Sequence, residues 1–344
     1  MTTDNKLRVV FYDPSGHGGI CHYTYQLAEG LERLGIDVTV LTSEGYELKH
    51  LKRNFKLKLL FRKSLIKDVA RHIAGRVGAK ISHRTEGQNA DQPTGMALEQ
   101  RIRIPAILKA LRLRLIFCKE ALAVFVNRFD IFHVQWLKDQ RQDYAFISML
   151  KLLGVAVVYT AHDLLPNTNA SPNDYGLLKR IYQKVDAIIV HGQANKDEIV
   201  SMFELNPRKI HLIPHGSNDL FYRDKEISKA AAKTELAIDP SRRVILFFGL
   251  IKRYKGLEYL VEAFDEIKGR IKDVVLLVAG RLYDRDDEAL RYYSGLINQL
   301  RTRDDVVCVP DYIPFEKIGL YFSAADLVVL PYTKSYTSGI LLTA

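Results

Sequence analysis

The apolar positions along the chain follow two alternating spacings. Residues 7–12 form a short, mostly apolar run, and residues 20–34 carry apolar side chains three or four positions apart. A glycine-rich turn at 13–19 separates these segments, and a second short apolar run follows at 36–41. The spacings predict a strand, a helix and a second strand, in that order. This order is typical of a βαβ unit, in which helices cover parallel strands.

The same alternation resumes near residue 130 and continues along the chain. We expect strands at 131–134, 155–160, 187–190, 209–214, 244–249, 274–280, 306–309 and 327–331, and helices at 98–128, 230–233, 256–267, 287–301 and 315–324. The sequence therefore predicts an α/β protein with two βα series in tandem: an N-terminal domain at 1–222, a linker region at 223–240 and a C-terminal domain at 241–344. The last residues, 339–344, have the pattern of the first turn of a further helix, so we expect the second domain to be incomplete in this sequence.

Length and composition agree with two packed domains. The 344 residues are 47% hydrophobic and 26% charged, which excludes disordered and fibrous classes. The sequence has neither a signal peptide nor an apolar run of the roughly 18 residues needed to cross a bilayer. Cys21, Cys118 and Cys308 lie far apart without a CxxC motif, so a disulfide framework or zinc site is not indicated. These features predict a cytoplasmic protein with reduced thiols.

The formal net charge of +10 arises in one segment. Residues 49–84, called the basic segment below, hold twelve lysines and arginines but a single acid, Asp68, so the remainder is nearly neutral. The pattern predicts an exposed strand at 55–59, followed by an amphipathic helix at 62–73. Its predicted patch comprises Lys52, Arg53, Lys56, Lys58, Arg62, Lys63 and Lys67. This patch suits an anionic membrane surface, a phosphate-rich acceptor or a solvated loop, whereas no recognised module supports nucleic acid binding.

Two loops follow apolar strands and could meet an anion. Gly16-His17-Gly18-Gly19 stands at a strand-to-helix turn, where glycines allow close backbone approach. The dinucleotide fingerprint fails because Cys21 occupies its third glycine position, and a tight turn without ligand is the alternative.

The second loop spans residues 249–256 and carries Lys252, Arg253 and Lys255. Cations at the carboxyl end of a strand suit a diphosphate, and a solvated surface loop is the alternative.

Three histidines also follow predicted strands. His162 stands beside Asp163 directly after the strand at 155–160, so it is a candidate for acid–base chemistry or for hydrogen bonding to a ligand. A structural hydrogen bond is the alternative role. His133 and His215 occupy similar places, but no partner stands at metal-ligand spacing, so no metal is expected.

Six segments, taken in chain order, resemble a family 4 glycosyltransferase. They are Gly18-Gly19, residues 159–163 (YTAHD), 213–216 (IPHG), 248–256 (FGLIKRYKG), 278–280 (VAG) and 325–331 (ADLVVLP). The resemblance implies a GT-B fold, with two Rossmann-like parallel-sheet domains facing across a cleft. It also implies a nucleotide-sugar donor held mainly by the C-terminal domain, retention of anomeric configuration and no obligatory metal.

The resemblance also implies roles for single residues. Gly19, with Gly18, would approach the donor, while Lys255, helped by Lys252 or Arg253, would neutralise the leaving diphosphate.

In the same resemblance, His162 would contact the transferred sugar near its reacting carbon, and backbone amides at Ser338 and Gly339 would face the phosphates. The sequence departs from the family where two glutamates with seven residues between them are usual. Ser335 and Thr343 stand there, as in a branch with a Ser-x-x-Ser-Gly variant.

The sequence therefore favours a retaining, hexosyltransferase-type glycosyltransferase of polysaccharide biosynthesis. It would move a sugar from a nucleotide-diphosphate sugar to a glycan or lipid-linked acceptor, with the donor as co-substrate and no cofactor. The acceptor would meet the N-terminal domain, and the protein would be cytoplasmic and peripheral at the inner membrane face. The alternatives are a non-catalytic relative that binds a glycan or a partner protein and, more weakly, a sugar-nucleotide epimerase.

Overall fold

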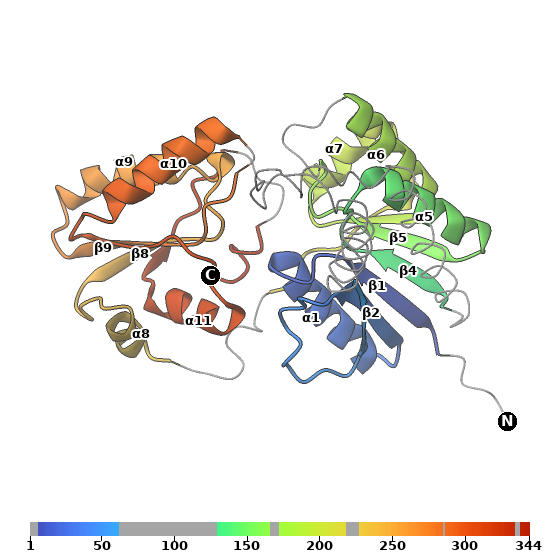
Figure 1. Ribbon diagram of the computed structural model, residues 1–344, viewed down its shortest axis with the longest axis horizontal. Coiled ribbons are helices and arrows are strands. Elements are labelled where there is room, and N and C mark those ends of the chain that lie inside the picture. The colour runs from blue at the N-terminus through green and yellow to red at the C-terminus, as the bar shows by residue number, and fades with distance from the viewer. Residues whose placement is uncertain (1–5, 62–128, 166–171, 218–226, 285, 334–337) are drawn as a thin grey trace, which may run out of the picture. The chain divides into compact units, whose positions relative to one another are not determined.

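The computed structural model describes residues 6–61, 129–165, 172–217, 227–284, 286–333 and 338–344 (Figure 1). The predicted helices at 62–73 and 98–128, together with Arg62, Lys63 and Lys67, lie outside the described residues. Within the described ranges, no helix has both the length and the apolar character needed to cross a membrane.

The first sheet has seven strands in the order β3-β2-β1-β4-β5-β6-β7. The strands are β1 Arg8–Asp13, β2 Asp37–Ser43, β3 Lys56–Phe61, β4 Ile131–Val134, β5 Ala156–Thr160, β6 Ala187–Val190 and β7 Ile210–Leu212. The pairings from β3 through β6 are parallel. Because β2 and β4 flank β1 on opposite sides, the strand order reverses beside β1. Open α/β sheets bind ligands at the carboxyl edge next to such a reversal.

The helices of this half are α1 Gly19–Arg33, α5 Gln140–Leu152, α6 Pro172–Lys184 and α7 Gln193–Phe203, followed by the 3₁₀ turn Pro207–Lys209. Cys21, Tyr25 and Ala28 share one buried face of α1, as their spacing of four and three positions requires. Helix α5 begins where the Asp139 carboxylate accepts the backbone N–H groups of Arg141 and Gln142. Helix α1 thus forms where the apolar spacing predicts a helix, whereas α5 was not among the predicted helices.

The second sheet has four parallel strands in the order β10-β9-β8-β11. They are β8 Arg243–Phe248, β9 Val274–Ala279, β10 Val306–Val309 and β11 Leu327–Val328, accompanied by α8 Lys229–Glu235, α9 Leu257–Lys268, α10 Asp287–Leu300 and α11 Phe315–Ala324. Alternate residues of β9 pack toward α9 and α10 on one face and toward α11 on the other. Burial on both faces explains why β8 and β9 are continuous apolar runs. The strand order reverses again, here beside β8.

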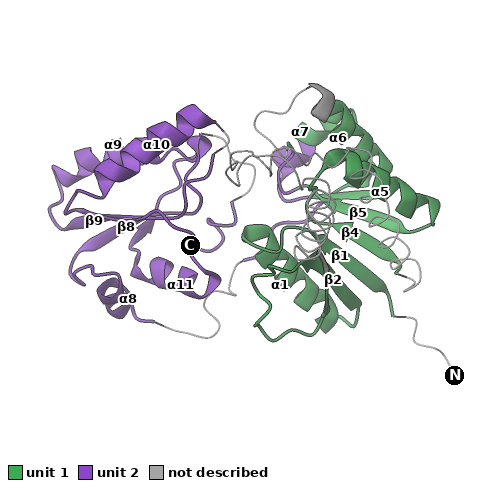
Figure 2. Ribbon diagram, viewed as in Figure 1, with its two compact units in different colours: residues 1–161, 165–189, 198–211 green, residues 162–164, 190–197, 212–344 purple. Residues whose placement is uncertain are grey.

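The chain divides into two compact units (Figure 2). One comprises residues 1–161, 165–189 and 198–211; the other comprises 162–164, 190–197 and 212–344. Helix α8 lies inside the predicted linker region and belongs to the second unit. There Lys233 donates to an Asp326 carboxylate oxygen at 2.8 Å, which ties α8 to the start of β11.

Candidate functional site

The glycine-rich turn between β1 and α1 rests on a buried carboxylate. Asp13 is fully buried, and its Oδ1 accepts the backbone N–H groups of Ser15 and Gly16 at 3.1 and 3.2 Å. Burial raises the pKa of Asp13, although these two hydrogen bonds act in the opposite direction. The buried carboxylate therefore holds the turn in place from its protein-facing side. Gly19, at the start of α1, is exposed.

The neighbouring Gly18 donates its backbone N–H to Glu47 Oε2 at 2.9 Å. The same carboxylate oxygen lies 3.3 Å from His22 Nε2. The amino end of α1 thus already faces a negative group of the protein itself. A ligand contact from Gly18 would have to displace Glu47, whereas Gly19 faces the surface.

The loop after β8 carries the three predicted cations and is closely held by its neighbours. Gly249 donates its N–H to Ala279 O at 2.9 Å, and Thr333 donates its N–H to Tyr254 O at the same distance. Gly256 adopts φ +65°, and a Cβ there would lie 2.2 Å from the carbonyl oxygen of Pro331. This close approach permits only glycine, and it fixes the end of the 3₁₀ turn Arg253–Lys255.

Lys255 is buried, with 9% of its surface exposed. Its Nζ donates to Tyr332 Oη at 2.9 Å and lies 4.7 Å from the centre of the Tyr332 ring. Among the described residues, no carboxylate lies within ion-pair distance of this ammonium. Burial raises the pKa of nearby Asp163, and the charges of Lys252 and Lys255 act in the opposite direction. A buried ammonium with one phenol as its hydrogen-bond partner and no ion pair has capacity for an anionic ligand.

The other two cations of the loop behave differently from each other. Lys252 Nζ lies 5.1 Å from the Tyr283 ring centre, and its pKa is lowered by burial and by the nearby charge of Lys255. Arg253 is 70% exposed and lies 3.5 Å from an Asp286 carboxylate oxygen. Lys252 and Lys255 therefore form the charged part of the site, while Arg253 turns to a surface acid.

His162 belongs to a group of three histidines, called the histidine cluster below. His162 Nδ1 lies 3.4 Å from His191 Nε2, and the His191 and His215 rings are 5.1 Å apart. The pKa values of His191 and His215 are lowered by burial. The sequence predictions did not include His191. Its position along the chain could have identified it. His191 directly follows β6, and His162 and His215 come shortly after β5 and β7.

His133 lies apart from this cluster. Complete burial lowers its pKa to about 3, and its Nε2 lies 2.7 Å from Thr160 Oγ1. It is therefore a neutral structural group.

The final turn of the chain lies beside the loop after β8. A Cβ on Gly249 would lie 3.8 Å from the Ile340 side chain, and Leu341 donates its N–H to Ser338 O at 3.1 Å. Thr343, at the position of the family's second glutamate, is buried and donates its hydroxyl to Gly339 O at 2.8 Å. The Thr343 side chain thus stabilises the final turn through this hydrogen bond and is not exposed at the surface.

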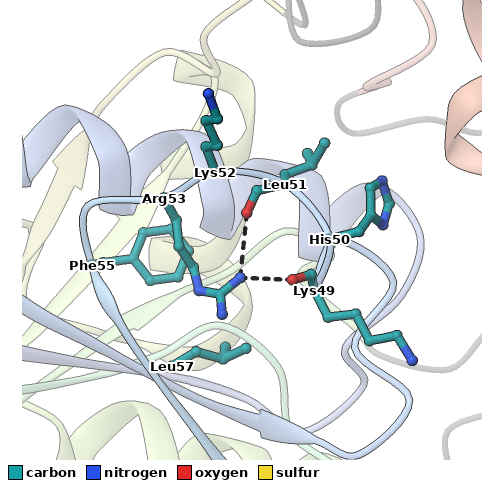
Figure 3. Close-up of a pocket in the computed structure, with 7 residues that line it drawn as sticks. All are labelled: Lys49, His50, Leu51, Lys52, Arg53, Phe55 and Leu57. Carbon is teal, nitrogen blue, oxygen red and sulfur yellow. Dashed lines mark hydrogen bonds between the residues drawn. The ribbon is translucent and has the colours of Figure 1, made fainter.

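The described part of the basic segment forms a pocket of about 480 Å³ (Figure 3). It is lined by Lys49, His50, Leu51, Lys52, Arg53, Phe55 and Leu57. Arg53 turns its guanidinium inward and donates to the carbonyl oxygens of Lys49 and Leu51 at 2.9 and 3.3 Å (Figure 3).

Lys56, between the lining residues Phe55 and Leu57, forms an ion pair with Asp37 at 2.8 Å. In the pairing of β3 with β2, Lys56 stands opposite Thr39 near the start of β2. The last residue of β3 stands opposite Ser43, the last residue of β2. Lys56 therefore lies toward the amino end of β2, away from the edge that carries Gly19. Lys52 and Lys58 are exposed. Within the described ranges, no group of three or more metal-ligating side chains is placed to hold a metal ion.

Comparisons with known proteins place these features in a family. The family model described as Glycosyltransferase Family 4 matches residues 17–219, which is more than half of the chain, and the model described as Glycosyl transferases group 1 matches residues 228–340. Both predicted halves of the chain are thus matched in order.

Several curated relatives are similar to parts of the chain. The D-inositol 3-phosphate glycosyltransferase of Segniliparus rotundus is 28% identical over 188 residues, covering 52% of this chain and 41% of the relative. The GDP-mannose:glycolipid 4-beta-D-mannosyltransferase of Xanthomonas campestris pv. campestris is 26% identical over 260 residues, covering 70% and 64%. The chain thus spans less than two thirds of the length of either relative.

Solved structures share the fold at low sequence identity. Anabaena HepE in complex with UDP and glucose has a TM-score of 0.66 at 14% identity, covering 97% of this chain and 77% of that one. The UDP-GlcNAc 2-epimerase of Methanocaldococcus jannaschii has a TM-score of 0.53 at 11% identity, covering 94% and 77%. The two parallel-sheet domains and these likenesses confirm the predicted GT-B fold class.

Proposed function

The chain belongs to Glycosyltransferase Family 4, and from this premise we propose that it transfers a sugar from a nucleoside-diphosphate sugar to a glycan or lipid-linked acceptor. The observation that carries the proposal is the pair Lys252 and Lys255 at the carboxyl end of β8. There the strand order reverses and Lys255 is buried without a carboxylate partner among the described residues. A diphosphate would bring negative charge to these two lysines.

The proposed chemistry follows from the charges that develop during transfer. Cleavage of the bond between the sugar and the diphosphate leaves negative charge on the phosphate and positive charge on the sugar carbon. Lys255 and Lys252, held in place before reaction, stabilise the leaving group electrostatically. Backbone N–H groups of the turn at Ser338 and Gly339 would add to this. No resident metal or cofactor is part of the proposal.

We place His162 at the transferred sugar, and we assign a donor contact to Gly19. We further propose a retaining outcome, in which a leaving phosphate oxygen takes the proton of the acceptor hydroxyl on the same face of the sugar. The names of the relatives include both alpha and beta products, as in an alpha-D-kanosaminyltransferase of Streptomyces kanamyceticus and the 4-beta-D-mannosyltransferase above. The anomeric configuration of the product, read by NMR, therefore tests this part separately.

Calorimetry tests the donor site directly. The chain is titrated with UDP, GDP and ADP, and then with sugar conjugates of the nucleotide that binds. Lys255→Ala removes a charged hydrogen-bond donor and should weaken binding roughly 10- to 100-fold. Lys317→Ala, on the exposed face of α11 in the same unit, is the matched control and should leave binding unchanged.

Turnover separates the alternative functions. Release of nucleotide that depends on an added acceptor supports the transferase. Conversion of the donor sugar without acceptor would instead indicate an epimerase, a reading favoured only by the similarity of fold. A chain that binds none of the nucleotides and turns over no donor would overturn the proposal in favour of a non-catalytic binding protein.

We also propose that the basic segment docks the protein on an anionic membrane surface, where a lipid-linked acceptor would lie. Of its described cations, Lys49, Lys52 and Lys58 are exposed and form no ion pair with other described residues, whereas Arg53 donates to backbone carbonyls and exposed Lys56 pairs with Asp37. Each exposed cation near an anionic surface contributes about 1 kcal/mol.

Co-sedimentation with phosphatidylglycerol vesicles should decrease in Lys52→Ala/Lys58→Ala and in high salt. The double variant Lys184→Ala/Lys317→Ala removes the same charge elsewhere and should sediment like the wild type. Equal binding to neutral vesicles would refute electrostatic docking.

A further inference from the structure

The histidine cluster contains a directed chain of hydrogen bonds. His191 Nδ1 lies 2.9 Å from the carbonyl oxygen of Ile213. A carbonyl oxygen only accepts, so His191 carries a proton on Nδ1 and donates it there. In a neutral imidazole the other nitrogen then has a lone pair. His191 Nε2 is consequently an acceptor, directed at His162 Nδ1 at 3.4 Å.

The backbone fixes these rings relative to one another. Ala161 donates its N–H to Ile189 O, and Ile213 donates its N–H to Val190 O, both at 2.9 Å. These bonds continue the strand pairing beyond β5 and β6, just where the histidines stand. His191 is 8% exposed and packs against the ring of His215. Its burial lowers its pKa, which is consistent with a neutral imidazole at neutral pH.

We propose that His191 is a positioning residue that holds His162 in the neutral tautomer with its proton on Nδ1. His162 Nε2 then carries the lone pair and accepts a hydrogen bond from a sugar hydroxyl. Free imidazole side chains prefer the opposite tautomer, so without His191 the same ring would present a donor. The hydrogen bond from His162 to His191 thus sets the polarity of the group that meets the sugar.

The tautomer itself does not depend on the proposed glycosyl transfer, although its role in sugar binding rests on that proposed function. The two are therefore tested by different measurements. Long-range ¹H–¹⁵N correlation spectra of histidine-labelled protein at pH 8 report which ring nitrogen carries the proton. His162→Gln removes the His162 signals and so assigns them.

Two variants of His191 form a matched pair. His191→Phe keeps a planar ring for packing but has no acceptor, whereas His191→Gln keeps an amide oxygen able to accept from His162. We expect His162 to be protonated on Nδ1 in the wild type and in His191→Gln. In His191→Phe its spectrum should move toward the tautomer protonated on Nε2.

A wild-type His162 that is protonated on Nε2 would overturn the proposal. So would an unchanged His162 tautomer in folded His191→Phe. Should His191→Phe not fold, the wild type and His191→Gln still decide between the two tautomers.

Kinetics test the consequence for sugar transfer. His191→Phe should lower kcat about tenfold, the scale of one lost hydrogen bond, with little change in the KM for the donor. His191→Gln should recover most of this loss. The double variant His162→Ala/His191→Phe should be no slower than His162→Ala, because His191 acts only through His162. Independent, multiplicative losses would refute this coupling. If no transfer is detected at all, the proposed function fails while the tautomer result stands.

Discussion

Gly280→Ala tests how closely the strand ends of the second sheet approach each other. Gly280 directly follows β9 and adopts φ +141°. A Cβ at this position would lie 1.9 Å from the carbonyl oxygen of Gly249, the first residue of the loop that carries Lys252 and Lys255. A carbon and an oxygen in contact normally stand about 3.3 Å apart. The two backbones would therefore have to separate by more than an ångström.

The cost has two sources. Forcing extra volume into a packed site costs about 1–3 kcal/mol. A side chain at this positive φ adds about 1–2 kcal/mol of backbone strain. We therefore expect Gly280→Ala to lower the free energy of unfolding by about 2–5 kcal/mol. Gly295→Ala is the matched control: it lies on the exposed side of α10 with no atom within 4 Å of an added Cβ, so it should gain up to about 1 kcal/mol of helix stability.

Urea unfolding followed by circular dichroism measures both variants. The midpoint of Gly280→Ala should fall by about 1–2.5 M, from an m-value of about 2 kcal/mol/M. At low urea the folded variant should also bind nucleotide more weakly, because the displaced loop carries Lys252 and Lys255. A Gly280→Ala midpoint equal to that of Gly295→Ala would show that Gly280 and Gly249 do not meet as described.

Further predictions concern charge and pH. The pKa of buried Asp143 is raised to about 7, chiefly by burial, so its stabilising contribution is present below about pH 4 and is lost as the pH rises to 7. Asp143→Asn should therefore melt at a higher temperature than the wild type at pH 8 and at a similar temperature at pH 4; equal differences at both pH values would contradict this. Lys233→Met removes a buried ammonium that donates to Asp326 and to Arg242 O, and should destabilise the fold by about 2–4 kcal/mol in urea titrations. Lys229 also pairs with Asp326, but its side chain is 51% exposed. Lys229→Met should therefore lower the free energy of unfolding by less than about 1 kcal/mol. Finally, EDTA should leave sugar transfer unchanged, and a loss restored by Mg²⁺ would refute the metal-independent mechanism.

The order of strands and helices was predictable because their apolar spacing reflects burial. Both faces of β9 are covered, which explains its continuous apolar run. Such a run in a sequence indicates a buried strand or a short helix, and the turn residues on either side favoured the strand. The extent of other elements depends on distant partners. The strand predicted at 327–331 ends at Val328, and Pro331 beyond it instead packs its carbonyl against Gly256. Helix α8 extends past the predicted 230–233 because Ser228 caps it and Lys233 finds Asp326 far along the chain.

The candidate site was predictable only in part, because spacing gives each residue's place on the chain but not its surroundings. Lys252, Arg253 and Lys255 were equivalent in the sequence. The 3₁₀ turn makes them different, since it buries Lys255 against Tyr332 and sends Arg253 to a surface acid. His191 had no motif of its own, and its contact with His162 arises from the pairing of β5 with β6.

The electrostatics of the two glycine-containing loops distinguish which is suited to the diphosphate. The first loop follows β1 and the second follows β8, and the strand order of each sheet reverses beside that strand. By position alone, either loop could therefore bind a diphosphate. At the first, Gly18 already donates to Glu47, and a phosphate placed there would meet a carboxylate. At the second, Arg253 donates its N–H to Asp284 Oδ2 at 3.3 Å and Asp163 lies near the lysines, but Lys252 and Lys255 stand together and Lys255 forms no ion pair among the described residues. The pair of lysines at the second loop therefore supports our proposal that the diphosphate binds there.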